Sequence, residues 1–280
     1  MMKLERQAQR QPSAATSGFW PRGLAVLGSG WLMALAAPPL GLWSLAWVGL
    51  IPLWFLAIRP NQSWRTAFFY GLIWGIGFHG SVISWITHLH PLTWMGVPWL
   101  GSVAIAAFAW SFITLWGSIT VGLWAMSLRW LQFLPVGARV LAATALWCLL
   151  EMLRNQSPLD WSSLALTQSP NNLWILQLSQ LSGQLGITAL IVGFSGLLAE
   201  AGRGLLLPHP GRYRHPQVLV AVALGLLLGG HTLGAVLLST AAADTPASAI
   251  SVGLIQGNVP TRVKLTPAGI NQALEGYLTG

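Results

Sequence analysis

Long apolar runs, separated by short polar or proline-containing segments, dominate the chain. A helix needs about 17 to 25 mostly apolar residues to cross the roughly 30 Å hydrocarbon core of a bilayer. The pattern predicts seven membrane-spanning helices, which together form a transmembrane helical domain over residues 20–239: 20–37, 42–58, 66–87, 100–127, 138–153, 184–201 and 217–239.

Local sequence features predict how some of these runs pack. Only the segment Pro-Pro-Leu-Gly at 38–41 separates the first two runs, and proline ends a helix while glycine permits a tight turn, so we expect a helical hairpin. Small residues at spacings of three to five allow membrane helices to approach closely. The third run is therefore expected inside the bundle, because it contains Gly71, Gly75, Gly77 and Gly80.

The composition supports a polytopic α-helical membrane protein and excludes an ordinary soluble domain. Hydrophobic residues make up 54% of the 280 residues and charged residues only 7%, whereas about 25% of a soluble domain is charged. The single cysteine, Cys148, excludes an intramolecular disulfide framework and a cysteine-rich metal centre.

The basic residues predict the orientation of the chain. Cytoplasmic loops hold an excess of Lys and Arg. With residues 1–19 as a cytoplasmic segment, the internal segments would hold most of the 14 basic residues, and the segment after 239 would be external. This placement explains the net charge of +8 without nucleic acid as a partner. The internal residues are Lys3, Arg6, Arg10, Arg22, Arg59, Arg65, Arg129, Arg139, Arg203, Arg212 and Arg214.

The residue composition of the chain changes after the last apolar run. Residues 240–249 form a linker of small residues, and 250–255 is a short apolar run that predicts a buried strand. Thr266 and Pro267 are typical of an N-cap and a first helical position, and apolar residues follow at helical spacing. About 30 residues are too few to bury a core. Residues 250–280 therefore predict the start of an incomplete soluble α/β domain.

Several short motifs, in this order along nearly the whole chain, resemble the bacterial apolipoprotein N-acyltransferases. They are Pro-Leu-Gly-Leu-Trp at 39–43, Leu-Ala-Trp at 45–47, Ile-Pro-Leu at 51–53, Ser-Trp-Ile at 84–86, Leu-Trp at 146–147 with Glu151, Leu153 and Arg154, Gln-Ser at 168–169, and Ile-Gln-Gly-Asn-Val-Pro at 255–260 with Lys264. In that family the last motif opens an extracytoplasmic nitrilase-like, or carbon–nitrogen hydrolase, domain.

The resemblance implies a multi-pass enzyme of the bacterial inner membrane, with its N-terminus cytoplasmic and its C-terminal segment periplasmic. Such an enzyme moves an acyl chain from a phospholipid donor to the N-terminal diacylglyceryl-cysteine of an apolipoprotein acceptor. A cysteine carries the acyl group as a thioester, a glutamate acts as base and a lysine stabilises the oxyanion. No cofactor is implied. These three residues would lie beyond residue 280, so no catalytic residue is assigned here and the 280-residue chain alone is expected to be inactive.

Glu151 and Arg154 are the candidate functional pair within the spans. They are three residues apart on a predicted helix and could form an ion pair. A carboxylate at membrane depth is costly, which favours a function, and Arg154 could bind a lipid phosphate. A structural pair that fixes the helix against the following loop is the alternative.

Other candidate side chains are better explained by structural roles than by catalysis or metal binding. Cys148 lies among apolar residues of the fifth run, where a buried thiol is unreactive, so packing is expected. His79, His88 and His90 lack further ligands at metal-binding spacing and are interpreted as interfacial residues; no metal site is predicted.

Two other classes of function remain open at the level of sequence. A transporter would need ionisable groups in several spans and internal repeats, yet apart from Glu151 the predicted spans hold almost none, and no repeat is evident. A non-catalytic membrane scaffold fits all the residues. It could be a degenerate copy, or one half of a split enzyme whose partner is a separate nitrilase-like chain.

Overall fold

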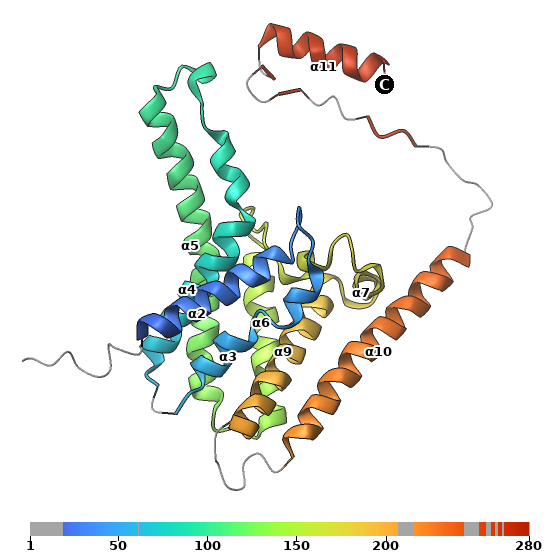
Figure 1. Cartoon of the computed structure of the whole chain (residues 1–280). Coiled ribbons are helices and arrows are strands. Elements are labelled where there is room, and N and C mark those ends of the chain that lie inside the picture. Colours follow the sequence, from blue (N-terminus) through green and yellow to red (C-terminus); the bar gives the residue numbers. More distant parts are fainter. Residues whose placement is uncertain are drawn as a thin grey trace, which may run out of the picture.

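The computed structural model describes residues 19–60, 62–206, 215–243, 252–255, 259–260, 263–264 and 266–279. This part of the chain is helical and contains no strand (Figure 1). The longer helices are α2 (Phe19–Leu35), α4 (Trp64–Val82), α5 (Trp99–Leu131), α6 (Val136–Arg154), α9 (Gln184–Leu206), α10 (Pro216–Ala243) and α11 (Pro267–Thr279). The shorter ones are η1 (Trp43–Trp47), α3 (Ile51–Ala57), η2 (Ser84–Leu89), η3 (Thr93–Met95), η4 (Leu164–Gln168), α7 (Leu173–Gln177) and α8 (Ser179–Ser182).

Four of the described helices are long and apolar enough to cross a membrane, namely α5, α6, α9 and α10. Each of the seven predicted runs contains helix, but the second run is broken into η1 and α3. Helix α3 has 7 residues, or about 10 Å, and cannot cross the hydrocarbon core as one rod. Pro52 stands in its first turn, where the missing N–H favours a new helix start over continuation.

The turn predicted at 38–41 is present, although the second arm of the expected hairpin consists of η1 and α3 instead of one continuous helix. Helix α2 ends at Leu35, and the chain turns back through Gly41, whose φ of +63° is readily adopted only by glycine. The amide N–H of Leu42 donates to the carbonyl of Leu35 at 3.0 Å and closes the turn. The entry to α4 is fixed similarly, because the Ser63 hydroxyl accepts from the amide of Thr66 at 3.0 Å as an N-cap.

The prediction that the third run lies inside the bundle is confirmed. Glycines let α4 contact its neighbours at backbone distance. A Cβ atom on Gly75 would lie 2.5 Å from Ser118 Cα of α5, and one on Gly71 would lie 2.5 Å from the Val121 carbonyl oxygen. A Cβ atom on Gly77 would lie 2.6 Å from the Leu27 carbonyl oxygen of α2. Helix α4 therefore packs between α2 and α5 without intervening side chains.

Four tryptophans fill the centre of the bundle. Trp54, Trp74 and Trp124 are fully buried, and Trp147 is nearly so. The rings of Trp124 and Trp147 meet edge to face at 4.8 Å. Two indole N–H groups donate to backbone carbonyls, Trp74 to Gly49 at 2.9 Å and Trp124 to Ala143 at 2.8 Å. Buried indoles need such acceptors, so these bonds fix α4 against the turn between η1 and α3, and α5 against α6.

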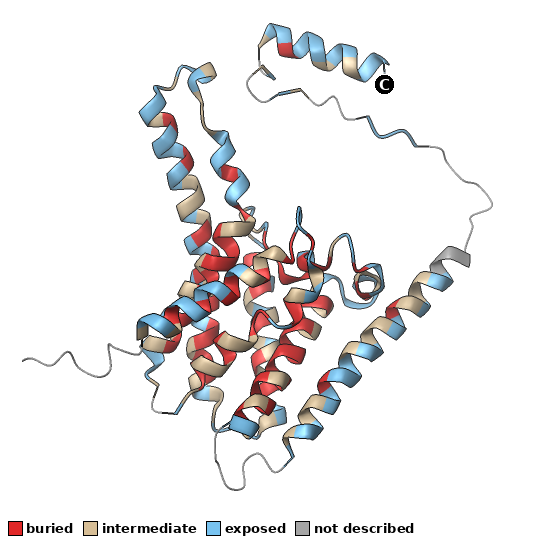
Figure 2. Ribbon diagram, in the orientation of Figure 1, coloured by how far each residue is buried: buried red, intermediate tan, exposed pale blue. Residues whose placement is uncertain are grey.

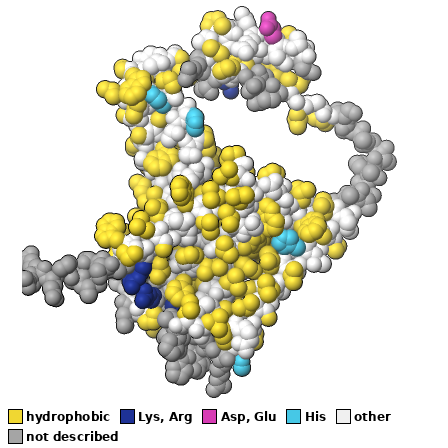
Figure 3. Space-filling model, in the orientation of Figure 1, with side chains coloured by type: hydrophobic (Ala, Val, Ile, Leu, Met, Phe, Trp, Pro, Cys, Tyr) yellow, Lys and Arg dark blue, Asp and Glu magenta, His cyan; other side chains and the backbone are white. Residues whose placement is uncertain are grey.

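Burial is uneven across the molecule. Buried residues concentrate in the middle of the bundle, on α4, α9 and the inner faces of α5 and α6, whereas α10 and the far end of α5 are mostly exposed (Figure 2). Helix α10 packs against α9 and α7 at one side of the bundle. The visible surface is largely hydrophobic and shows few basic side chains, most of them at one edge of the bundle (Figure 3). Such a surface suits contact with lipid chains.

The segment after α10 departs from the prediction in two ways. Helix α10 continues to Ala243, so the predicted linker 240–249 begins as helix, and its residues 244–249 lie outside the described residues. The described part of the predicted strand, 252–255, is not a strand. A strand needs a hydrogen-bonded neighbour, and the described residues offer none. Helix α11 does begin at Pro267, and the Thr266 hydroxyl accepts from the Gly269 amide at 3.2 Å.

Candidate functional site

Glu151 and Arg154 lie in the last turns of α6 and are both buried, with 2% and 6% of their surface exposed. The chain that follows, residues 155–172, folds back over this end of the bundle and leads to α7. Asn155 caps α6, its amide donating to the Glu151 carbonyl at 2.8 Å. The two charged side chains are therefore covered by their own following loop.

Neutral donors surround the Glu151 carboxylate. Ser163 of the loop and Thr188 of α9 donate their hydroxyls to Oε1 at 2.5 and 2.9 Å. The indole N–H of Trp147, one turn earlier on α6, donates to Oε2 at 3.1 Å. A buried carboxylate is tolerated only with such donors. Glu151 consequently links α6, α9 and the loop at one point.

Arg154 forms its ion pair with Asp160 of the loop. Its Nε lies 2.8 Å from Asp160 Oδ1, and Nη2 donates to the Ser162 carbonyl at 3.3 Å. Nη1 lies 3.5 Å from His79 Nε2. A guanidinium can only donate, so that ring nitrogen is the acceptor, and His79 Nδ1 donates to Ser162 Oγ at 2.7 Å. His79 therefore joins α4 to the same network.

The direct contact expected between Glu151 and Arg154 is replaced by two separate partnerships. Helical spacing does place both side chains at the same end of α6. Arg154 stands at the helix end and reaches the loop, whereas Glu151, one turn earlier, faces α9. His79 also differs from the interfacial placement expected, since only 1% of it is exposed.

A second set of polar contacts fixes the same loop to other elements. Asn171 Nδ2 donates to the Gly41 carbonyl at 2.9 Å, and Gln168 Nε2 donates to the Trp43 carbonyl at 3.3 Å. Asn172 Nδ2 lies 3.2 Å from His231 Nε2 of α10. The loop thus holds the first hairpin and α10 as well as α4, α6 and α9.

Comparison with known proteins identifies the family. The family model described as the apolipoprotein N-acyltransferase N-terminal domain matches residues 29–197. The chain belongs to this family. An apolipoprotein N-acyltransferase of Nostoc sp. is 43% identical over 255 residues, covering 89% of this chain and 49% of the relative. Those of Synechocystis sp. and Thermosynechococcus vestitus are 37% and 39% identical, covering 89% and 90% of this chain and 52% and 47% of theirs.

The chain thus spans about half the length of these N-acyltransferase relatives. The family match contains the whole Glu151 and Arg154 network and the loop that covers it. Helix α10 and everything after it lie beyond the matched residues. The resemblance noted in the sequence motifs is confirmed at the level of family.

A second buried ion pair was missed from the sequence, because almost no ionisable group besides Glu151 was expected in the spans. Arg139 of α6 donates through Nε and Nη2 to Glu200 of α9 at 2.7 and 3.0 Å. Trp54 Nε1 donates to the same carboxylate at 3.2 Å. Both charged side chains are almost completely buried. The sequence did contain a signal for this pair, because Arg139 and Glu200 are charged residues inside two predominantly apolar runs.

Cys148 lies on α6 between the two ion pairs. Its thiol is partly buried, with Sγ 3.7 Å from the Leu185 carbonyl oxygen. The environment favours the packing role expected from the sequence over a nucleophilic one.

Proposed function

We propose that this chain is the membrane-embedded part of an apolipoprotein N-acyltransferase. The complete enzyme would transfer an acyl chain from a phospholipid to the α-amino group of the N-terminal diacylglyceryl-cysteine of an apolipoprotein. The family match over residues 29–197, reinforced by the 43% identical relative, is the observation that carries the proposal. The four apolar helices and the hydrophobic surface support an enzyme that works on lipid within the membrane.

We propose that all seven helical segments belong to the membrane domain, with the N-terminus in the cytoplasm. Four basic residues support this orientation because they share one end of the bundle. Arg129 Nη1 donates to the Arg59 carbonyl at 3.0 Å, which brings two predicted cytoplasmic loops together. Arg139 and Arg203 both lie near Glu200 at the corresponding ends of α6 and α9. Such clustering is typical of the cytoplasmic side.

In this proposal the Glu151 and Arg154 network has a positioning role. It would hold the loop 155–172 rigidly at the periplasmic end, beneath the nitrilase-like part that residues 250–280 begin. Every partner of the Glu151 carboxylate is a neutral donor and Arg154 is paired with Asp160. These groups are satisfied by one another, which favours rigidity over proton transfer or phosphate binding.

The chemistry would belong to the nitrilase-like part. A cysteine thiolate would attack the phospholipid ester carbonyl, form a thioester and release the lysophospholipid. The acceptor amine would then attack the thioester, forming an amide and returning the thiol. The membrane part would hold the enzyme at the surface where both substrates reside and would bring their acyl chains within reach.

A chimera tests this function. Residues 1–280 would be joined to the second half of the Nostoc relative and expressed in a bacterium depleted of its own N-acyltransferase. Mass spectrometry of lipoprotein N-terminal peptides should show the third acyl chain. A chimera with alanine at the nucleophilic cysteine of the second half is the matched control. Stable insertion of the chimera without any N-acylation would overturn the proposal.

Thiol labelling tests the orientation separately. Cys148→Ser would remove the native thiol, and single cysteines would be placed at exposed positions on opposite ends, Gln156→Cys and Leu134→Cys. A membrane-impermeant maleimide applied to spheroplasts should label the first variant and spare the second until the membrane is permeabilised. The reverse pattern would contradict the proposed topology.

A further inference from the structure

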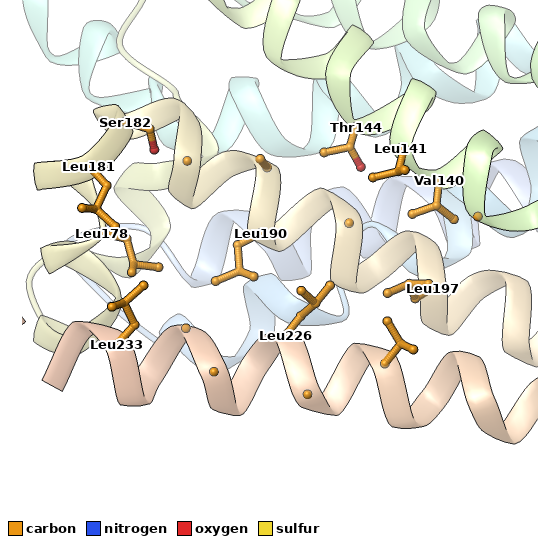
Figure 4. Close-up of a pocket in the computed structure, with 18 residues that line it drawn as sticks. Val140, Leu141, Thr144, Leu178, Leu181, Ser182, Leu190, Leu197, Leu226 and Leu233 are labelled. Carbon is orange, nitrogen blue, oxygen red and sulfur yellow. The ribbon is translucent and has the colours of Figure 1, made fainter. Parts of the chain in front are cut away.

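An apolar groove of about 740 Å³ lies on the side of the bundle away from α2 and α4. Its floor is α9, its walls are α6 and α10, and the end of α7 with α8 closes one end. Figure 4 shows Leu190 of α9 and Leu226 and Leu233 of α10 directed into it. The volume falls in the range of roughly 300–1,000 Å³ found for small-molecule sites.

The residues that line the groove favour a hydrocarbon ligand. None of its residues is charged, and the only side-chain polar groups are the hydroxyls of Thr144 and Ser182. A headgroup or a charged peptide would find no partner there. A saturated or unsaturated chain would lose nothing by entering, because it has no polar group to satisfy.

The length and depth of the groove fit one lipid tail. Its lining extends from Gly186 to Leu197 on α9 and from Val222 to Leu233 on α10. Eleven residues of helix rise about 16 Å. That is about half of the roughly 30 Å hydrocarbon core, the depth that one leaflet occupies.

The groove is continuous with the surface that faces lipid. Leu141, Leu226 and Leu233 line it and are also 73%, 42% and 44% exposed. Its three principal helices are among the four that can cross a membrane. A tail could therefore enter sideways while its headgroup stays at the interface.

Two glycines keep one wall open. Gly225 and Gly229 are one turn apart on α10, and an ideal Cβ on either would meet no atom within 4 Å. The same spacing also occurs where two membrane helices approach each other closely through small residues. Here Leu226 and Leu233 project into the same space (Figure 4). The shape is that of a channel, which a flexible chain fills better than a helix.

We propose that the α6–α9–α10 groove binds one acyl tail of a bilayer phospholipid, as a lipid site distinct from the Glu151 and Arg154 network. The inference uses the membrane placement of the proposed function but not acyl transfer. Lipid binding at the groove and N-acylation by the chimera can therefore succeed or fail independently.

The test uses the 280-residue chain in vesicles of phosphatidylethanolamine and phosphatidylglycerol that contain a phosphatidylethanolamine with a diazirine in the middle of one tail. After irradiation and digestion, mass spectrometry locates the adducts. We expect them to concentrate on the groove residues of α6, α9 and α10. Gly225→Leu and Gly229→Leu should reduce groove adducts at least tenfold, because leucine fills the channel without meeting the backbone.

Ala221→Leu is the matched control, since it places the same leucine side chain at an exposed position of α10 outside the groove lining. It should leave the groove adducts unchanged. Adducts spread evenly over all lipid-facing residues, or unchanged in both glycine variants, would overturn the proposal. A cysteine at 225 that forms a disulfide between two chains and excludes the lipid would also overturn it, in favour of a helix as occupant.

Discussion

Glycines in α4 and α10 have the same sequence setting and opposite surroundings. Gly71 and Gly75 are four residues apart within an apolar run, and each lies against the backbone of α5. Gly225 and Gly229 have the same spacing within another apolar run, and neither would place a Cβ near any atom. One pair closes an interface and the other leaves a groove open. Glycine spacing alone therefore does not predict packing; the partner helix decides.

The same contrast separates the two sides of the bundle. Helix α6 contacts α9 through Arg139 and Glu200 at one end and through Glu151 and Thr188 at the other. Between these contacts the groove opens toward α10. Polar contacts thus hold the ends together while the apolar middle remains accessible to lipid.

The largest expected loss of stability comes from disrupting the Arg139–Glu200 ion pair, which holds one end of α6 against α9. Arg139→Ala would leave the Glu200 carboxylate buried without its main partner. Removing one member of such a pair costs about 3–5 kcal/mol of unfolding free energy. Chemical denaturation of the full chain in bicelles, followed by tryptophan fluorescence, would measure it.

The control replaces both members together, as Arg139→Met with Glu200→Leu. It should recover part of the loss, because neither charge of the Arg139–Glu200 pair is left buried, although Arg203 loses its 4.0 Å contact with Glu200. Equal stability of Arg139→Ala and the wild type would show that the ion pair does not hold this end.

The next largest loss of stability is expected from a bulky residue at the glycine interface between α4 and α5. Gly75→Leu would force α4 and α5 apart, because Ser118 Cα stands where the new Cβ would lie. Overpacking typically costs about 1–3 kcal/mol, and a clash with backbone atoms places this substitution at the upper end of that range. The same denaturation experiment applies, and unchanged stability would refute the backbone contact between the two helices.

Glu151→Gln tests the contact at the other end of α6, where Glu151 binds Thr188 of α9, and should reduce stability less. The amide keeps the shape but offers its NH₂ group to surrounding donors, so one or more buried hydroxyls lose their acceptor, at about 1–3 kcal/mol. Hydrogen exchange of residues 155–172 should become faster. Glu275→Gln, on the exposed side of α11, is the control and should change neither quantity. A loop that exchanges at the original rate would contradict the positioning role.

The open glycines should give the smallest effect on stability. The Cβ atom of Gly225→Leu would meet no atom within 4 Å, and the change exchanges glycine for a stronger helix former, so stability should stay the same or rise by about 0.5–1 kcal/mol. A loss comparable with that of Gly75→Leu would mean that α10 packs closely against another helix, and the contrast between the two glycine pairs would fail.

Local signals predicted local structure well. Thr266 and Pro267 located the start of α11, residues 38–41 located a turn, and the glycines of α4 indicated a buried helix. These predictions depend on neighbours in sequence, whose geometry the residue types restrict directly.

Contacts between distant residues escaped prediction. The sequence singled out Glu151 and Arg154 as a candidate pair, but their partners Thr188 and Asp160 follow from how the loop and α9 fold back. Arg139 and Glu200 are 61 residues apart, so no spacing rule connects them. The described part of the expected strand, 252–255, is not a strand for a related reason, since a strand exists only with a partner.

The acylation state of lipoproteins made by the chimera tests the central claim most directly. If residues 1–280 form the membrane part of an apolipoprotein N-acyltransferase, cells that depend on the chimera should make lipoproteins with three acyl chains, and the cysteine-to-alanine control should leave two. A chimera that inserts with the proposed topology and still leaves every lipoprotein with two acyl chains would contradict it.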